Sequence, residues 1–487
     1  MTTVIVWFRR DLRLADNPAL TEALRRYQQV VPVYIHDDKQ REWPIGGAAA
    51  WWLYHSLGSL RKEMRARGGN LIYRLGDAER VLRDLIGESG ARAVYWNRCY
   101  EPYAIERDTR VKTQLLEKGI DCRSFKGSTL FEPWEIKTVG GTPYQVFTPF
   151  WRAVQRTLPG SERSLLPAPR QLPVLSGKIR KGTLKEMKLL PDIKWYKGFT
   201  EVWQPGEAGA QACLKHACRS IFTAYPDRRD IPGEEGTSRL SPHLSFGELS
   251  PYQLKHALDA LAVREAKDGL LAGMEAFFRQ LVWRDFAYHL LFHFPHTDAK
   301  PLRPAFERFP WRNRSRYREP LRRWQQGLTG IPIVDAGMRQ LWRTGWMHNR
   351  VRMIVASFLT KNLLTPWQEG AAWFWDTLVD ADLANNSLGW QWVAGSGADA
   401  APYFRIFNPV SQGERFDPDG GYVRRWVPEL STLDRRYVHR PWEAPEAILR
   451  TAKLRLGKDY PLPIVDLKVS REAALDAYQQ MKKNSEK

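Results

Sequence analysis

The chain has few cysteines and no long apolar stretch. Its four cysteines, Cys99, Cys122, Cys213 and Cys218, show no C-x-x-C spacing, which disfavours a zinc or thiol redox site. No segment approaches the roughly 18 apolar residues of a membrane span. Residues 1–8 also lack the basic segment that precedes the apolar run of a signal peptide. We therefore expect a protein of the reducing cytoplasm.

Glycine-rich phosphate motifs and low-complexity tracts are also missing. The first apolar run, Val4–Phe8, leads into Arg9–Arg13 without the G-x-G-x-x-G of dinucleotide-binding folds and without a P-loop. A composition of 43% hydrophobic and 26% charged residues excludes a disordered or fibrous chain. The length of 487 residues favours two or three domains.

Basic residues and tryptophans are in excess. Lys and Arg number 74 against 54 Asp and Glu, and the formal charge of +20 favours a polyanion such as nucleic acid over a merely soluble surface. Of the 21 tryptophans, eleven lie between Trp283 and Trp426. A core needs large apolar side chains but has no special need for indoles, so this density indicates stacking or electron transfer.

The N-terminal part alternates short apolar runs with helical patterns. Asn17 and Asp77 are the expected N-caps of two of the helices. This spacing predicts an α/β fold, a doubly wound parallel sheet of the flavodoxin or Rossmann type, over residues 1–131. The predicted strands are Val4–Phe8, Val30–Ile35, Leu71–Leu75, Ala93–Trp96 and Ile120–Phe125.

The rest of the chain predicts a connector and a helical domain. Residues 132–200 are rich in proline, glycine and lysine, which predicts a connector over the surface. Residues 201–487 predict an all-helical domain, and Arg471–Lys487 a short charged helix or a frayed tail. The predicted helices are Pro251–Leu261, Gly273–Phe294, Glu319–Gln326, Ile333–Thr344, Arg350–Leu364 and Trp367–Leu378.

Two polar segments leave two interpretations open. Glu235–Ser241 places three hydroxyls and Arg239 beside a glycine, which suits a diphosphate or a helix-capping turn. The acidic pair Asp380 and Asp382 can bind the polar edge of a planar heterocycle. Alternatively, Asp382 caps a helix and Asp380 pairs with an arginine.

Two helical faces carry groups that suit a nucleobase. Gln280, Trp283 and Arg284 share one face and can read a base and its phosphate, unless Trp283 is buried and Arg284 pairs with an acid. Asn349 and Met353 share a second face with Arg352.

The histidines do not predict a metal site. His348 is more typical of a structural histidine than of a catalyst. His289 and His293 are four residues apart but lack the glutamate of an H-E-x-x-H pattern, so we expect no zinc hydrolase.

Five sequence motifs, in a fixed order along the chain, carry a resemblance to a known family. In these motifs the chain resembles, over nearly its whole length, the photolyase and cryptochrome family of blue-light flavoproteins, and most closely its cyclobutane pyrimidine dimer photolyases. The resemblance implies an α/β domain that can hold an antenna pigment and a helical domain that binds bent FAD. The blocks are Trp7–Arg13 with Asp16–Pro18, Glu235–Leu240, Trp283–Phe286, Gly345–Arg350 and Ala400–Pro409.

The resemblance implies a FAD site and an electron-transfer chain. Arg352 and Asp380 would pair beside the isoalloxazine, Asp382 would meet its polar edge, and Asn386 would face N5. The implied electron-transfer residues are Trp390, Trp367 and Trp311, with Trp324 as an alternative outer member. The implied cofactor-binding residues are Tyr225, Thr237, Ser238, Arg239, Leu240, Ser241, Phe277, Arg352, Asp380, Asp382 and Asn386.

UV-damaged DNA is the implied partner. The lesion would swing out of the duplex into a pocket over the flavin, where an electron from reduced FAD would split the dimer. Trp283 and Trp392 would pack the two bases. The implied catalytic residues are Gln280, Trp283, Asn349, Met353, Asn386 and Trp392, and the implied DNA-binding residues are Arg229, Arg284, Arg350 and Arg405.

The sequence departs from the family pattern at two positions. Gln280 stands where dimer photolyases carry glutamate, and an amide cannot readily release a proton. Phe277 replaces a common tryptophan. One alternative is therefore a cryptochrome-type photoreceptor with weak or no repair. Another is (6-4) photoproduct repair, although Asn349 and Met353 replace the histidines of that class.

Further expectations concern cofactors, assembly and location. No cysteine follows Cys218, which excludes the iron-sulfur cluster of one family branch, and we expect no metal. An antenna, methenyltetrahydrofolate or a deazaflavin, is compatible with the resemblance. Without a heptad seam or an apolar surface stretch, we expect a monomer. We expect no membrane association and a bacterial-type cytoplasmic location, at the nucleoid when DNA is bound.

Overall fold

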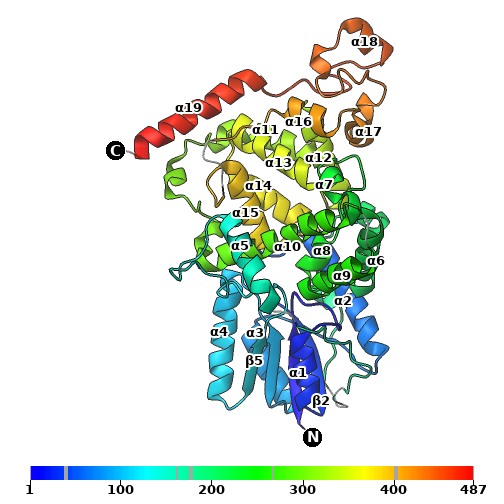
Figure 1. The fold of residues 1–487 in the computed structure, drawn as a ribbon, viewed down its shortest axis with the longest axis vertical. Helices are drawn as coiled ribbons and strands as arrows, with labels where there is room; N and C mark the ends of the chain where they lie inside the picture. The colour runs from blue at the N-terminus through cyan, green and yellow to red at the C-terminus, as the bar shows by residue number, and fades with distance from the viewer. Residues whose placement is uncertain are drawn as a thin grey trace.

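A computed structural model describes residues 2–37, 42–160, 163–173, 175, 179–265, 268–399 and 404–485. Residues 400–403 of the motif block Ala400–Pro409 and six residues of the predicted connector lie outside this set. The sheet forms one end of the molecule, the helical domain lies above it, and the C-terminal helix runs along the outside (Figure 1).

The N-terminal domain is a five-stranded parallel sheet in the order β3-β2-β1-β4-β5. The predicted doubly wound sheet is confirmed, and each predicted strand agrees with the structure to within one residue at either end. The strands are β1 (Thr3–Phe8), β2 (Gln29–His36), β3 (Ile72–Leu75), β4 (Ala93–Asn97) and β5 (Asp121–Phe125).

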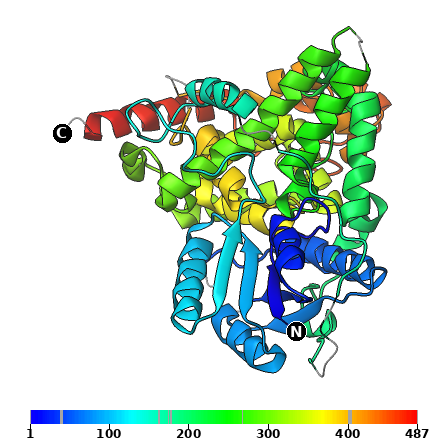
Figure 2. The same ribbon diagram turned by 60° about the horizontal axis from the view of Figure 1, so that its bottom comes forward.

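Helices cover both faces of the sheet (Figure 2). Alternate residues of a strand point to opposite faces, so Val4 and Val6 pack with α1 and α2, whereas Ile5 and Trp7 pack with α3 and α4. Both expected caps are confirmed, since Asn17 accepts from the Leu20 amide and Asp77 from the Arg80 amide. The helices are α1 (Pro18–Arg26), α2 (Gly47–Arg65), α3 (Ala78–Ser89) and α4 (Pro102–Glu117).

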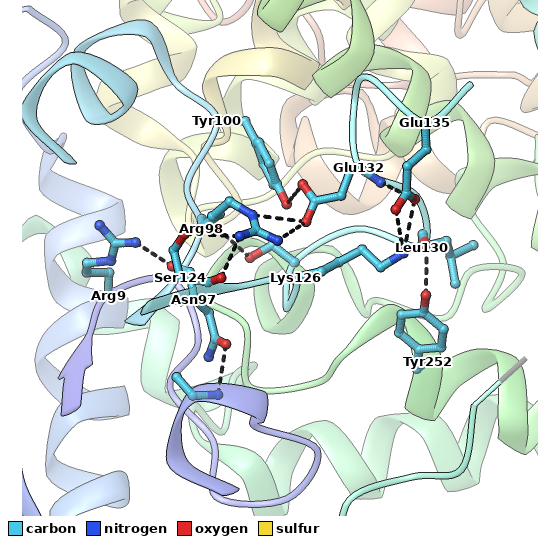
Figure 3. Close-up of polar contacts among 12 residues, drawn as sticks. Arg9, Asn97, Arg98, Tyr100, Ser124, Lys126, Leu130, Glu132, Glu135 and Tyr252 are labelled. Carbon is cyan, nitrogen blue, oxygen red and sulfur yellow. Dashed lines mark hydrogen bonds and ion pairs between the residues drawn. The ribbon is translucent and has the colours of Figure 1, made fainter. Parts of the chain in front are cut away.

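The carboxyl ends of β1 and β4, where the strand order reverses, are occupied by the domain's own polar groups. Ligands of open α/β sheets usually bind at such a point. Here Asn97 donates to Asp11 at 2.6 Å and to Asn17 at 2.8 Å, and it accepts from the Ala19 amide at 3.2 Å. Figure 3 shows Asn97 among the polar contacts at this edge of the sheet.

The predicted connector is partly buried. It begins with Glu132, which accepts from Arg98 and Tyr100 at 2.6 and 2.7 Å (Figure 3). It also contains α5 (Phe147–Thr157), whose Phe147 and Phe150 are buried in the helical domain against α10. The prediction of a purely superficial connector is therefore wrong for α5, while the domain boundaries stay a prediction.

The helical domain contains fourteen α-helices in the part of the chain that the structure describes. They are α6 (Glu207–His216), α7 (Tyr225–Arg228), α8 (Ser241–Ser245), α9 (Pro251–Arg264), α10 (Leu270–His293), α11 (Arg314–Gln326), α12 (Pro332–Thr344), α13 (Asn349–Ser357), α14 (Trp367–Thr377), α15 (Leu383–Ala394), α16 (Pro409–Phe416), α17 (Gly421–Trp426), α18 (Glu446–Thr451) and α19 (Leu467–Ser485). The six predicted helices are present. None of the described helices is both long enough and apolar enough to span a bilayer.

Two of these helices refine the prediction. The predicted helix Arg350–Leu364 consists of α13 followed by the π-helical turn Phe358–Asn362. Of the two alternatives for the C-terminal segment, a short charged helix or a frayed tail, the structure shows the helix, the 19-residue α19. Its Ala474, Ala477 and Met481 are buried in a cluster that also contains Phe306 and Phe309, and this apolar contact holds the tail in place.

The two domains are joined by buried hydrogen bonds. Arg13 donates to the Gly247 carbonyl at 2.9 Å, and Ser250 donates to Asp16. Gly247 has φ +65°, and a Cβ there would lie 2.1 Å from the Arg10 carbonyl, so the close approach requires glycine. Asp285 of α10 accepts from the Leu130 and Phe131 amides at the end of the N-terminal domain, and burial raises its pKa to about 7.

Candidate functional site

The centre of the candidate site is an ion pair that joins three segments distant in sequence. Arg352 of α13 donates to Asp380 Oδ2 at 2.7 Å, and Ser241 at the start of α8 donates to the same oxygen at 2.7 Å. Arg352 Nε also donates to the Met347 carbonyl at 2.8 Å, which fixes the guanidinium. The structure thus brings together residues predicted to bind the phosphates and the isoalloxazine.

One oxygen of this buried carboxylate has no partner. Asp380 Oδ1 makes no hydrogen bond within the part of the chain that the structure describes. A buried acceptor without a donor is rare in folded proteins. The N–H groups of a flavin are donors of the kind that Oδ1 lacks, so the predicted residues fit this cofactor.

Asp382 caps a helix, as the plainer interpretation predicted. Its Oδ1 accepts from the Asn385 amide at 2.9 Å at the start of α15, and its other oxygen accepts from the Tyr288 hydroxyl at 2.5 Å. Burial alone would raise the pKa of Asp382, but Arg284, Arg10 and these hydrogen bonds hold it below its usual value. Both oxygens already have protein donors, and contact with a flavin edge stays a prediction.

The hydroxyl segment runs beside the ion pair. Gly236 lies against the Arg228 carbonyl, where a Cβ would come within 2.2 Å. Arg239 adopts a left-handed conformation with φ 53°, unusual for a residue with a side chain. Its guanidinium lies over the rings of Trp346 and Trp203, 5.4 and 6.0 Å from their centroids. Leu240 is buried and directly precedes α8.

An aromatic wall borders the site at the start of α10. Tyr225 meets Phe277 edge to face with 5.3 Å between the ring centroids, and Phe222 lies 4.5 Å from Phe277. Arg229 lies over the Tyr225 ring at 5.4 Å. Phe277 is therefore the apolar centre of this wall.

Gln280 lies one turn further along α10. Its amide Nε2 donates to the Ala276 carbonyl at 3.2 Å, and its Oε1 lies 3.5 Å from Arg229 Nη2. The side chain is half-buried. Since the second contact is long, Oε1 can accept a shorter hydrogen bond from a ligand.

Trp283 stacks on Phe147 of the connector helix. The two ring centroids are 3.6 Å apart and the planes are tilted by 7°. This contact covers one face of the indole and holds it in one orientation, while the side chain stays half-buried. Neither Phe147 nor this stacking was predicted.

The second predicted face is present on α13. Asn349 is exposed, and its Nδ2 lies 3.9 Å from the sulfur of half-buried Met353. Arg350 instead points away, pairs with Asp230 at 2.8 Å and lies over the Phe416 ring at 4.3 Å. Arg350 is thus partly occupied by protein contacts.

The α15 residues have different exposures. Asn386 is half-buried and its Nδ2 donates to the Ala371 carbonyl at 3.0 Å, which leaves Oδ1 as an acceptor without a hydrogen bond among the described residues. Trp392 is half-buried, whereas Trp390 is 2% exposed.

The predicted electron-transfer tryptophans run from the core towards the surface. Trp390 and Trp367 are both buried, and Trp311 is half-buried. Gly370 of α14 makes room for the Trp390 ring, since a Cβ there would lie 2.0 Å from it. Trp324 is fully buried and donates to the Val355 carbonyl. Of the two candidates for the outer position, only Trp311 reaches solvent.

Arg284 does not lie on the surface. Its guanidinium is buried, donates to the Ser128 and Leu244 carbonyls, and lies over the Tyr288 ring at 4.8 Å. A group held between the domains in this way cannot reach a DNA phosphate. We therefore leave Arg284 out of the proposed DNA site.

The histidines singled out in the sequence have structural contacts. His348 caps α13 by accepting from the Arg350 amide, and burial lowers its pKa to about 4. His289 Nδ1 lies 2.8 Å from the Pro133 carbonyl, and Nε2 accepts from Tyr144. Among the described residues, no three His, Cys, Asp or Glu side chains are placed to hold a metal ion.

Comparisons with known proteins cover both domains. Residues 4–171 match the family model described as DNA photolyase, and residues 277–480 match the FAD-binding domain of DNA photolyase. The chain is 49% identical to a deoxyribodipyrimidine photo-lyase of Agrobacterium fabrum, over 99% of this chain and 98% of that protein. It is 38% identical to Cryptochrome-1 of Arabidopsis thaliana, over 98% of this chain and 70% of that protein.

A solved structure agrees with these matches. The crystal structure of a bacterial class III photolyase from Agrobacterium tumefaciens superposes with a TM-score of 0.93 at 48% identity, over 99% of this chain and 98% of that chain. A likeness of this extent covers both the sheet and the helical domain. The chain belongs to the DNA photolyase and cryptochrome family.

Proposed function

We propose that this protein is a deoxyribodipyrimidine photo-lyase that repairs cyclobutane pyrimidine dimers in DNA under blue light. The observation that carries the proposal is the ion pair of Arg352 with buried Asp380, which is joined to Ser241 and whose Oδ1 has no partner among the residues that the structure describes. It lies beside side chains suited to a flipped base, in a chain that is 49% identical to a named photo-lyase over nearly its full length.

The chain's own residues would bind and orient the cofactor. Bound FAD supplies, in its reduced and excited form, the electron that splits the cyclobutane ring. Asp380 would accept a hydrogen bond through Oδ1, and Asn386 would present its free amide oxygen. The hydroxyls of Thr237 and Ser238 would bind the phosphates.

The DNA side of the site would combine aromatic and basic groups. Trp283, held by Phe147, and Trp392 would stack on the two bases of the flipped dimer. Asn349 and Met353 would line the same pocket. Exposed Arg405 would contact flanking phosphates. Arg229 and Arg350 are the other residues proposed to contact DNA phosphates.

The test is a repair assay with one defined substrate. Photoreduced protein, blue light and a thymine-dimer oligonucleotide are combined, with Gln280→Glu beside the wild type. We expect repair by the wild type and at least tenfold faster repair by Gln280→Glu, because a carboxylic acid can donate a proton that the amide cannot. Dimer that is bound normally but left unchanged by both proteins overturns the proposal.

A blue-light receptor is the second candidate, and Gln280 favours it. Its amide lacks the acid expected of a dimer photolyase, and the chain is 38% identical to Cryptochrome-1 over 98% of its length. This function predicts a light-dependent change in oligomeric state or partner binding without repair. Size-exclusion chromatography in blue light and in darkness tests it, and identical profiles count against it.

The photoreduction path gives a separate test. We propose that Trp390, Trp367 and Trp311 pass electrons to excited flavin. Trp311→Phe is then expected to slow photoreduction more than tenfold, whereas Trp324→Phe leaves it within about twofold because Trp324 does not reach solvent and cannot serve as the outer member. Absorbance of the flavin under blue light, with an external thiol present, measures the photoreduction rate of both variants. Equal rates in the two variants contradict this assignment.

Three further features belong to the proposal. A methenyltetrahydrofolate or deazaflavin antenna would serve as a light collector. The protein would act as a monomer in the cytoplasm, at the nucleoid when bound to damaged DNA. Extraction of pigments from purified holoprotein and its mass in solution test the first two features.

A further inference from the structure

A strip of arginines lies along α11, directly after Trp311 in the sequence. Residues 311–326 contain six arginines and one acid, Glu319. Among the described residues, the only ion pair of this segment joins Glu319 to Arg322 at 2.7 Å. The arginine strip consists of three exposed side chains without an ion pair in that same part of the chain, Arg314, Arg316 and Arg318.

The charge of the arginine strip opposes the ordinary electrostatics of a helix. Acidic side chains are favoured at a helix N-terminus, but the first turn of α11 has none and contains Arg314 and Arg316. Arg314 and Arg318 are also four residues apart, a spacing at which like charges repel. Natural proteins break such local rules mainly at functional sites. An anion bound to this surface would relieve both repulsions.

The acids near the arginine strip are already engaged. Glu369 of α14 accepts from the Tyr317 hydroxyl at 2.7 Å. Glu307 lies four residues before Trp311, and the charge of the adjacent Arg308 offsets it. The charges that face solvent beside Trp311 are therefore mainly positive among the residues that the structure describes.

Trp311 lies within range of these charges. The indole is half-buried and ends the proposed electron-transfer chain at the surface. Its turn is fixed, since the Arg312 amide donates to the Leu364 carbonyl at 2.9 Å and the ring centroids of Phe309 and Trp311 are 4.4 Å apart. Consecutive Cα atoms are about 3.8 Å apart, so the Cα atom of Arg314 lies within about 11 Å of that of Trp311. Exposed charges act over about 10 Å at ordinary salt, and the arginine side chain extends this range.

We propose that the arginine strip is a docking surface for a small anionic one-electron donor, of the ascorbate class, that restores Trp311 after light-driven electron transfer. This surface would add the electron source to the proposed electron-transfer chain, on which the inference rests. Charge complementarity selects an anion, and the position beside the outer tryptophan selects a donor of electrons. Charges of one sign beside a site raise the local concentration and the encounter rate of solutes of the opposite sign.

The step at Trp311 is the transfer of one electron. The electron that leaves the chain of Trp390, Trp367 and Trp311 ends on the excited flavin, and the outer indole becomes a radical cation. The docked anion gives one electron to this indole, which restores the neutral ring. The oxidised donor leaves with one negative charge fewer, so its attraction to the arginine strip is weaker and release is favoured.

Flash photolysis with two donors tests the docking surface in the full-length, FAD-loaded protein. The decay of the tryptophan radical after a laser flash gives the rate constant of each donor. Ferrocyanide is the anionic probe, and hydroquinone, which is neutral at pH 7, is the uncharged one. Raising the salt from about 20 to about 300 mM is expected to slow ferrocyanide at least fivefold and to leave hydroquinone within about twofold. An equal response of the two donors overturns the inference.

Matched variants separate the local charge from the overall charge. Arg314→Gln/Arg318→Gln is expected to lower the ferrocyanide rate constant at least threefold at low salt and to leave hydroquinone unchanged. Arg83→Gln/Arg110→Gln is the control, because it removes the same charge from exposed arginines of α3 and α4 beside the sheet, at the other end of the molecule from α11 (Figure 1). Equal slowing by the two pairs shows that only the overall charge matters and overturns the inference.

Trp311→Phe distinguishes a failure of the chain from a failure of the surface. If Trp311 is the outer member, this variant loses the donor-dependent decay with both donors. An unchanged decay with both donors contradicts the proposed chain and, with it, the docking surface. A decay that is lost in Trp311→Phe but unaffected by Arg314→Gln/Arg318→Gln overturns the docking surface alone.

A redox-inert anion gives a readout that does not depend on electron transfer. Hexacyanochromate is paramagnetic and broadens the NMR signals of nearby indole N–H groups in isotope-labelled protein kept in the dark. The Trp311 signal is expected to broaden before that of Trp342, although Trp342 is 47% exposed and Trp311 is half-buried. Arg314→Gln/Arg318→Gln should abolish this preference. Earlier broadening of Trp342 overturns the inference. Displacement of the anion by undamaged duplex DNA also overturns it, and would identify the arginine strip as a DNA contact.

Discussion

The two domains each contain a cluster of buried polar side chains, and the two clusters differ in one respect. At the sheet, Asp11, Asn17 and Asn97 bond to one another and to backbone groups, so that every polar atom of these side chains has a partner. In the helical domain, Asp380 is also buried, yet Oδ1 has none among the described residues.

This difference shows where the molecule can take a ligand. A saturated network stabilises the fold and offers nothing to a guest, whereas an unpaired buried acceptor costs free energy until a donor arrives. Polar residues at the reversal of strand order are therefore insufficient evidence for a binding site. The unsatisfied atom is the better indicator. Substitutions in the sheet cluster are expected to change the free energy of unfolding, and those in the helical-domain cluster the FAD affinity.

The largest effect, a loss of stability, is expected from Asp11→Ala in the polar cluster of the sheet. The change leaves the Asn97 amide and the Arg9 backbone N–H short of an acceptor, which costs roughly 3–5 kcal/mol of unfolding free energy. Urea denaturation measures this loss. The FAD dissociation constant of the folded fraction is expected to stay within twofold of the wild-type value. A tenfold weaker affinity would contradict the view that this cluster only stabilises the fold.

Asp380→Asn is expected to lower the FAD affinity rather than the free energy of unfolding. The amide can still accept from Ser241 but loses the charge that faces Arg352 and the flavin, so FAD affinity falls about tenfold or more, or about 1.4 kcal/mol. Fluorescence titration of the apoprotein measures the affinity. Asp434→Asn is the matched control, because Asp434 forms a surface pair with Arg436. An equal loss of FAD affinity in the two variants would contradict a specific role for Asp380.

The contact between the connector and α10 is expected to weaken in acid. Burial lowers the pKa of His289 to about 4, while an unfolded histidine titrates near 6.5. The unfolded state therefore binds the extra proton first, and stability falls as the pH drops below 6.5, by about 2 kcal/mol at pH 5. His289→Gln, with His293 left intact, should reduce this dependence of the free energy of unfolding on pH. Parallel pH profiles for the two proteins would contradict this.

The smallest effect is expected from Asp77→Ala at the start of α3. The cap accepts from the Arg80 amide, and its loss costs about 1 kcal/mol. Asp77→Asn retains an acceptor and is expected to recover most of that loss in urea denaturation. Neither variant should alter flavin affinity, because α3 lies on the face of the sheet away from the helical domain.

The sequence predicted the sheet well because its signals are local. Strand runs and the caps Asn17 and Asp77 depend on neighbours within a few residues, and the structure confirms them. In the helical domain, the spacing placed Gln280 and Trp283 on α10. The resemblance alone paired Arg352 with Asp380, a contact that no local pattern specifies.

The remaining features depend on distant segments. Phe147 reaches Trp283 from the connector, and the aromatic run around Phe147 and Phe150 was the only signal that this region contributes to the core. Arg284 has the same local pattern whether it faces DNA or the interior. The Ser128 and Leu244 carbonyls, which sequence spacing cannot position, decide that it is internal.

Gly370 and Trp390 depend on one another. A methyl group at position 370 and the indole at 390 would occupy the same space, 2.0 Å apart. An alanine at 370 therefore requires the indole at 390 to move. With Trp390 in place, the usual gain of about 1 kcal/mol from replacing a mid-helix glycine by alanine is not expected at this position.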